Sequence, residues 1–317
     1  MSGILGEAEL AAAWCWEADD RVPRRPAMTE FRRRARYRQA RWREANGHPI
    51  GSQPIVPKAG AAARPVGSRM PLAYAKQTGA NFVTSGAQAA ARARTSFVEK
   101  HQSFDHQALW ADLLSSPALS FNLFGDLAAD LALADQALHT WWPDAPGTVR
   151  EIRFAHSPGR FDPTYLNSLR AFDTAFVLQR DDGTQGIVAV DTNYHELAKR
   201  EQPKPRNMPR NLEVAERSGA FIRPVVDPGA RSELTVMWLE HLLALSMVQH
   251  PSGTWTWARY VVLHPAANPD VTDLCARYQS FLADPGTFAA LTLDDLLATD
   301  ALPRRTAAAL RDRYQLG

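Results

Sequence analysis

The amino-acid sequence predicts an α/β domain, in which a mixed sheet is flanked by helices, with a helical extension at the N-terminus. Three observations support this fold class. The segment 117–142 has apolar residues at helical spacing, the segments from 149 to 193 alternate between apolar and polar residues, and an apolar helix precedes a last expected strand at 256–264. The chain has 317 residues, 45% of them hydrophobic, which is enough apolar material for a large core.

The first 110 residues are expected to form an Arg-rich region of helices and extended chain. Helices are predicted over 7–20, 28–46 and 84–101. Between the last two, Gly, Pro and Ala residues up to about position 70 indicate an extended loop. The expected domain organisation is therefore this region over 1–110 and an α/β domain over 111–317.

The regular elements of the α/β domain follow in order. A single helix is expected over 117–142, because leucines recur at helical spacing and Pro143 ends the pattern. Strands are expected at 149–156, 171–179 and 186–193. Helices are then expected at 211–219 and 232–250, before the strand at 256–264. The C-terminal region is predicted to be mostly helical, and Thr292 begins a capping box there.

Composition and short motifs limit the compartment and the chemistry. No stretch of 18 uncharged apolar residues occurs, so no membrane-spanning helix is expected. No secretory signal is visible, and Cys15 and Cys275 form no paired motif, so the expected location is a reducing cytoplasm. The segment 195–199 begins like a zinc-protease helix but has Lys199 where a second histidine is required.

Basic residues are concentrated near the N-terminus. Between positions 21 and 43 there are ten arginines and one acidic residue, Glu30. Arginine binds phosphate through two parallel hydrogen bonds, so the cluster is a candidate nucleic-acid contact. A solvated helix face, or pairing with acids elsewhere in the fold, explains the same pattern. The candidate contacts are Arg32, Arg33, Arg34 and Arg36.

The expected hairpin over 171–193 brings two acidic residues together. Its turn, Asp181-Asp182-Gly183, suits a three-residue loop with glycine in the left-handed conformation. In that register Asp173 faces Asp191. Because side chains alternate along a strand, Asp173, Asp191 and Asn193 project from one face, which is otherwise apolar.

Two facing carboxylates repel each other, and burying them is costly without a counter-ion. A divalent cation resolves this conflict, and oxygen ligands favour Mg²⁺ or Mn²⁺. The alternative is that Asp173 and Asp191 lie at strand ends, where they point into water or bond to neighbouring backbone.

The order of the motifs adds a resemblance to these physical arguments. An expected strand is followed by Ser157-Pro158-Gly159-Arg160, the next begins Ala171-Phe172-Asp173, and the hairpin leads to Val188-Ala189-Val190-Asp191-Thr192-Asn193-Tyr194-His195-Glu196. Together with the segment 115–126, this pattern resembles the PD-(D/E)xK nuclease superfamily, in particular a bacterial family of restriction endonuclease-like proteins. The similarity covers about 112–225, and the region from 42 to 82 is consistent with it.

The resemblance implies a restriction-endonuclease-like α-β-β-β-α-β core with the active site at the end of the central hairpin. Asp173 and Asp191 would be the two acids of the motif and, with the carbonyl of Thr192, would hold Mg²⁺ or Mn²⁺. Glu151 would be an outer acid, and Arg160 would bind a phosphate. Surface pairing and turn structure explain Glu151 and Arg160 equally. The implied partner is DNA, cleaved in restriction or another defence role, and many nucleases of this fold form homodimers.

The sequence departs from the motif at Asn193, which stands where a catalytic lysine is expected. A neutral amide can orient a water molecule but cannot supply positive charge. Two functions are compatible with this departure. The first is an active metal-dependent nuclease, in which the metal or Lys199 supplies the missing charge. The second is a catalytically impaired nuclease-fold module that binds nucleic acid or a partner protein.

Overall fold

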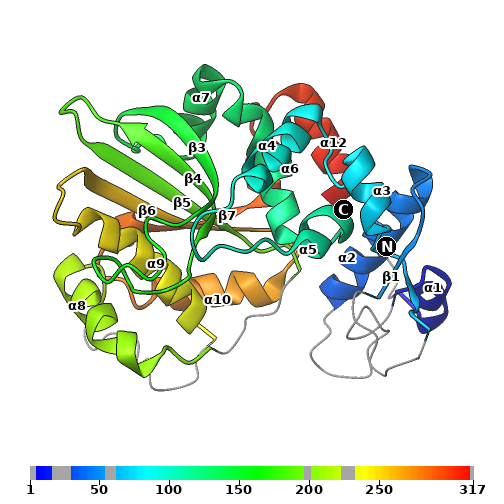
Figure 1. The fold of residues 1–317 in the computed structure, drawn as a ribbon, viewed down its shortest axis with the longest axis horizontal. Coiled ribbons are helices and arrows are strands. Elements are labelled where there is room, and N and C mark those ends of the chain that lie inside the picture. The colour runs from blue at the N-terminus through cyan, green and yellow to red at the C-terminus, as the bar shows by residue number, and fades with distance from the viewer. Residues whose placement is uncertain (1–4, 16–29, 54–61, 196–200, 223–232, 315–317) are drawn as a thin grey trace.

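In a computed structural model of the chain, the structure describes residues 5–15, 30–53, 62–195, 201–222 and 233–314. Within these residues, five strands form one mixed sheet in the order β3-β4-β5-β6-β7 (Figure 1). Strands β3 (Thr148–His156), β4 (Phe172–Gln179) and β5 (Gln185–Thr192) are antiparallel. Strands β6 (Trp255–His264) and β7 (Phe288–Thr292) continue the sheet in parallel with β5. The predicted α/β fold with a mixed sheet is confirmed.

Helices cover both faces of this sheet (Figure 1). One face packs against α4 (Ser85–Ser96), α6 (Ser116–Ala128), α7 (Leu131–Trp141), α11 (Leu293–Ala298) and α12 (Arg304–Tyr314). The other face packs against α8 (Met208–Ser218), α9 (Thr235–Val248) and α10 (Pro269–Gln279). Each face buries its own apolar core, so both sides of the central strands read as apolar.

The N-terminal region adds short elements beside the first helical layer. They are α1 (Glu7–Ala12), α2 (Glu30–Ala45), β1 (Gly51–Ser52), β2 (Pro65–Val66), α3 (Leu72–Thr78) and α5 (His106–Ala111). Helices α2 and α12 are in contact, and one apolar core includes residues from Phe31 to Tyr314. Contacts therefore cross position 110, and the domain division at that position stays a prediction.

The predicted single helix over 117–142 is wrong, because the structure contains two helices there. Helix α6 ends at Ala128, and the carboxylate of Asp130 then accepts a hydrogen bond from the amide of Leu133, at 3.0 Å. The amide of Leu133 lies in the first turn of α7 and has no main-chain partner within the helix. The side chain of Asp130 supplies that partner and so caps the start of α7.

Three further regions differ from the sequence-based expectations. Helix α4 ends at Ser96, because Phe97 takes an extended conformation. Strands β1 and β2 pair within the segment expected as a loop, and β7 lies in the region expected to be mostly helical. Helix α1 ends at Ala12, and residues 16–20 of the helix expected over 7–20 lie outside the described residues. The N-cap of the expected capping box is confirmed at Thr292, since its hydroxyl accepts a hydrogen bond from the amide of Asp295.

The register of the central hairpin is as predicted. Thr174 pairs with Val190 and Ala175 with Ala189, so the next position along places Asp173 opposite Asp191. Gly183 has φ +83° in the turn, a conformation that a residue with a side chain rarely adopts. The hairpin therefore sets which face receives the two acids. None of the helices in the described part of the chain has the length and apolar character that a bilayer crossing requires.

His241 is a buried histidine on α9, and its side chain points into the core. Its Nδ1 lies 2.9 Å from the hydroxyl of Tyr278, and the rings of Phe221, Tyr260 and Phe288 surround it. Burial lowers the pKa of His241 to about 3. As the pH falls, this histidine is protonated near pH 6.5 in the unfolded chain but only near pH 3 in the folded chain. Acidification between these two values therefore favours unfolding.

We expect His241→Phe to make stability less dependent on pH. Between pH 7.5 and 5.5 the wild-type histidine removes about 1.4 kcal/mol from the free energy of unfolding, since the unfolded state gains its proton in this interval. The variant lacks this loss. Urea denaturation, followed by tryptophan fluorescence at both pH values, measures the free energy of unfolding. If this free energy changed between pH 7.5 and 5.5 by the same amount in the variant and the wild type, His241 would not be the source of the pH dependence.

Candidate active site

Two carboxylates lie together where β4 begins and β5 ends. Asp173 is the second residue of β4, and Asp191 is the residue before the last of β5. Oδ2 of Asp173 accepts a hydrogen bond from the main-chain amide of Thr192, at 3.0 Å. One carboxylate oxygen is therefore bonded to neighbouring backbone, as in the alternative considered from the sequence, while both acids share a face as the register requires.

Asp191 lies within a set of polar side chains. Its Oδ2 is 3.4 Å from the hydroxyl of Tyr260 and 3.4 Å from the side-chain nitrogen of Asn193. Tyr260 reaches this position because β6 runs parallel to β5 and pairs Tyr260 with Ala189, two residues before Asp191. Burial and the negative charge of Asp191 raise the pKa of Tyr260 well above its usual value, so the phenol remains a hydrogen-bond donor at neutral pH.

The donor set suits a hard divalent cation. Asp173, Asp191 and the main-chain carbonyl of Thr192 offer only oxygen atoms, which Mg²⁺ and Mn²⁺ prefer. Among the described residues, no three His, Cys, Asp or Glu side chains converge on one point. Two carboxylates beside main-chain oxygen match Mg²⁺ in particular, because this ion usually keeps several waters.

The comparison with known families agrees with this geometry. A family model described as the PD-(D/E)XK nuclease superfamily matches residues 19–315. The chain belongs to the PD-(D/E)XK nuclease superfamily. No curated protein and no solved structure matches the chain. The match covers nearly the whole chain, so helices α2 to α5 of the N-terminal region and the sheet all lie within the similarity to this superfamily, while α1 precedes it.

The structure does not bring every predicted site residue of this PD-(D/E)XK protein to the carboxylates. Glu151 lies on β3 opposite Val177, four residues along β4 from Asp173, and its carboxylate pairs with Arg153 at 2.8 Å. Its role as an outer acid stays a prediction. Lys199 lies outside the described residues.

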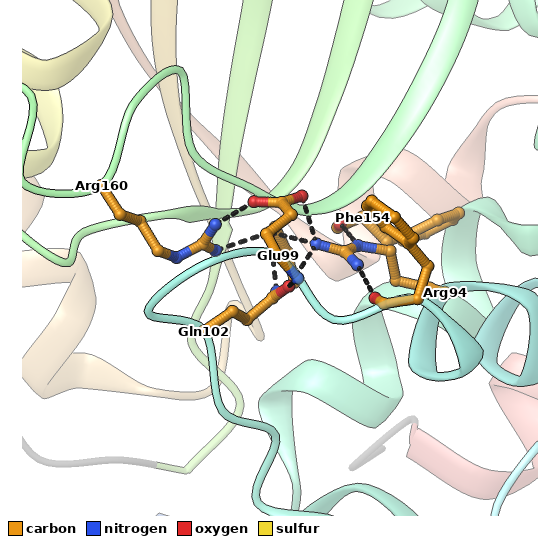
Figure 2. Close-up of polar contacts among 7 residues, drawn as sticks. Arg94, Glu99, Gln102, Phe154 and Arg160 are labelled. Carbon is orange, nitrogen blue, oxygen red and sulfur yellow. Dashed lines mark hydrogen bonds and ion pairs between the residues drawn. The ribbon is translucent and has the colours of Figure 1, made fainter.

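Arg160 is held by an ion pair after the end of β3. Its side chain is 6% exposed and contacts the carboxylate of Glu99, while a second nitrogen donates to the carbonyl of Ala155 at 3.2 Å. Figure 2 shows Arg160 and Arg94 approaching Glu99 from two sides. Because its guanidinium is engaged in this way, Arg160 is placed to hold the loop after β3, and its binding of a phosphate stays a prediction.

The predicted phosphate contacts on α2 are only partly open to solvent. Arg33 and Arg34 pair with Glu30, at 3.8 and 3.0 Å, and Arg36 is buried. Arg32 is half-buried on the same helix. Pairing with Glu30 of the same helix, rather than with acids elsewhere in the fold, therefore accounts for part of the cluster, and contact with phosphate stays a prediction.

Two residues near the carboxylates were missed from the sequence. Tyr260 lies in a correctly predicted strand, and the alternation of that strand could have placed it on the same face. Glu240 lies on α9, within the segment expected only as an apolar helix. It is buried and accepts a hydrogen bond from Arg170 at 2.6 Å, and burial raises its pKa while Arg170 opposes that rise. The charge of Glu240 also raises the pKa of Tyr260.

Proposed function

We propose that this chain is a metal-dependent nuclease that hydrolyses DNA phosphodiester bonds, in restriction or another defence role. The observation that carries the proposal is the pair Asp173 and Asp191, facing each other at the end of the central hairpin in a member of a nuclease superfamily. Asp173, Asp191 and the carbonyl of Thr192 would hold Mg²⁺ or Mn²⁺. When bound, such an ion supplies an acidified water and stabilises the negative charge that develops on the phosphate.

The protein's own groups have separate tasks in this proposal. Tyr260 donates to Asp191 and orients its carboxylate, since the phenol keeps its proton at neutral pH. The carboxamide of Asn193, beside Asp191, can hold a water molecule through hydrogen bonds but adds no charge. Asn193 therefore acts as a positioning residue.

A cleavage assay tests the proposed function. Purified protein is incubated with plasmid DNA and with modified phage DNA, each with Mg²⁺, Mn²⁺ or EDTA. We expect cleavage with either metal ion and none with EDTA. Parallel RNA substrates show whether DNA is preferred, and size measurement in solution shows whether the chain forms a homodimer. Cleavage that persists in EDTA would contradict a metal-dependent reaction.

The second candidate function is an impaired nuclease-fold module that binds nucleic acid or a partner protein. Asn193, in place of the expected lysine, is the observation that favours it. If the wild type binds DNA without cleaving it, Asn193→Lys should produce metal-dependent cleavage, because the ammonium restores a positive charge beside Asp191. Asn193→Gln is the matched control that adds length without charge, and it should remain inactive.

The basic helix α2 gives a prediction common to both functions. Replacing Arg32, Arg33 and Arg34 with glutamine should weaken DNA binding for all sequences alike and lower the salt dependence of binding. Each lost phosphate contact reduces the slope of log affinity against log salt concentration by about 0.9. Binding titrations at several salt concentrations measure this slope. An unchanged slope would place the nucleic-acid surface elsewhere.

A further inference from the structure

A cavity lies along the outer edge of β3, between this strand and α4. Its volume is about 590 Å³, and its walls include Phe97, Phe154, His156 and Ser157. Strand β3 has β4 on one side only, so the other side of the strand faces this cavity and the helix. The volume is within the range of sites that bind small organic groups.

Two buried polar atoms in this cavity have no hydrogen-bond partner within the described residues. They are Nε2 of His156 and Oγ of Ser157. Each of these residues is 9% exposed. Burial lowers the pKa of His156 to about 3, so its ring is neutral near pH 7 and offers one donor and one acceptor nitrogen. Buried polar atoms are normally satisfied, and these two lack a partner among the described residues. Neither atom is open to solvent in this structure, so a polar group in the cavity bonds to them once the side chains turn toward it.

The remaining walls favour a flat, uncharged group. Ile152 and Phe154 are apolar and buried, and Phe97 lies at the cavity with 66% of its side chain exposed. The charged residues of the lining balance one another, since Arg94 pairs with Glu99 and Arg153 with Glu151. An anion gains little from such a balanced set. An aromatic ring with a polar edge can pack on the apolar side chains and form hydrogen bonds with the polar ones.

Phe97 is held in place by a polar network (Figure 2). Arg94 donates to the carbonyl of Phe97 at 2.7 Å and to the carboxylate of Glu99 at 2.7 Å. Gln102 accepts from Arg94 at 2.9 Å and from the amide of Glu99 at 3.1 Å. Arg160 binds the other oxygen of Glu99. The exposed ring is therefore presented on a rigid support, which lowers the entropy lost when a second ring stacks on it.

The polar end of the cavity lies close to the candidate active site. His156 pairs with Phe172, and Asp173 is the next residue along β4. The side chain of Asp173 projects from the face covered by α8, α9 and α10, whereas α4 covers the other face. A nucleic-acid strand with one phosphate at the carboxylates therefore reaches the cavity by passing around the outer edge of β3.

We propose that this cavity receives one unstacked nucleobase of the nucleic acid bound at the candidate active site. Phe97 stacks on the base, and His156 and Ser157 hydrogen-bond to its polar edge. This inference rests on the proposed function, because a nucleic acid must be bound nearby. The base comes either from a single strand or from a duplex that extrudes it, and the two sources share the same chemistry.

The test uses 2-aminopurine, whose fluorescence rises when it leaves the stack of neighbouring nucleobases, which quench it more strongly than a phenylalanine ring does. The full-length protein is titrated in EDTA against single-stranded and duplex oligonucleotides with 2-aminopurine at successive positions. We expect a rise at one position near the cleavage site. A rise with both substrates indicates extrusion from the duplex, and a rise with the single strand alone indicates that a free strand supplies the base.

Three variants separate stacking from general effects. Phe97→Ala should weaken binding by about 5- to 150-fold and remove the fluorescence rise, because a stacked base is lost. Ser157→Ala should keep the rise and alter which base is preferred. The matched control is Val98→Ala, since Val98 is also exposed, at 55%, and does not line the cavity. It should bind within about twofold of the wild type.

The possible failures are distinguishable. Metal-dependent cleavage without a fluorescence rise at any position would overturn the base cavity and leave the proposed function intact. Equal loss of binding in Phe97→Ala and Val98→Ala would also overturn it, since the cavity would then have no special role. Absence of nucleic-acid binding by the wild type would overturn both proposals.

Discussion

Replacing Asp191 with asparagine is expected to lower metal-dependent cleavage by about 1,000-fold. Asparagine keeps the size of the side chain and can still accept the hydrogen bond from Tyr260 through its oxygen. It removes the negative charge that a divalent cation requires. The same result is expected for Asp173→Asn, whose oxygen can still accept the amide of Thr192. Initial rates of plasmid nicking with Mg²⁺ and with Mn²⁺ measure the loss.

A charge removed elsewhere on the same hairpin is the matched control. Asp181 lies exposed in the turn between β4 and β5, and Asp181→Asn should leave the rate within about twofold of the wild type. The apparent affinity for Mn²⁺, measured by calorimetry, should fall with Asp173→Asn and Asp191→Asn but not with the control. Equal cleavage by all four proteins would show that the reaction occurs at another site.

The largest loss of stability is expected for Arg313→Met. Arg313 on α12 is fully buried. Its guanidinium donates to Oε1 of Gln39 at 3.0 Å and to the carbonyl of Leu113 at 3.2 Å. It also donates to the main-chain oxygen of Asn81 at 2.7 Å and to Oδ1 of Asn81 at 2.6 Å. Methionine fills similar space and removes all of these donors, although the main-chain oxygen of Asn81 keeps a hydrogen bond from the side chain of Asn122 at 3.1 Å. We therefore expect the free energy of unfolding to fall by about 3 kcal/mol, partly offset because no charge is then buried.

Arg305 provides the control for this substitution, because it is exposed on the same helix. Arg305→Met should change stability by less than about 0.5 kcal/mol. Guanidinium denaturation of the three proteins at one pH measures both effects. Similar stabilities for Arg313→Met and the wild type would show that the buried guanidinium contributes no net stabilisation.

The parts of the fold that local chemistry determines could be predicted from the sequence. The register of the central hairpin follows from its Asp-Asp-Gly turn and from alternation, both of which act over a few residues. The break between α6 and α7 was missed although Asp130 is a local capping residue, because the leucine repeat continues on both sides of it. Strand β7 has five residues and depends on pairing with β6, which its own sequence does not indicate.

The candidate site was predicted only where it is built from one hairpin. Tyr260 and Glu240 approach the site through the packing of β6 and α9, which no local pattern specifies. For Arg160, the sequence led to a role that the structure does not show. The resemblance to the nuclease superfamily implied a phosphate contact for Arg160, but its partner Glu99 is distant in the sequence and contacts it only in the folded chain. A long-range ion pair that no local pattern indicates therefore engages this arginine.

The position of the hairpin within the sheet has a consequence for how this protein can change over evolution. Strands β4 and β5 each have a neighbouring strand on both sides, so main-chain bonding from β3 and β6 supports the spacing between Asp173 and Asp191. The α2 arginines and the loop around Phe97 lie outside this frame. Under the functions proposed above, substitutions on α2 alter how tightly nucleic acid is bound, and substitutions at Phe97 alter which nucleotide is preferred, without moving the two acids. Substrate binding and reaction chemistry can then diverge separately.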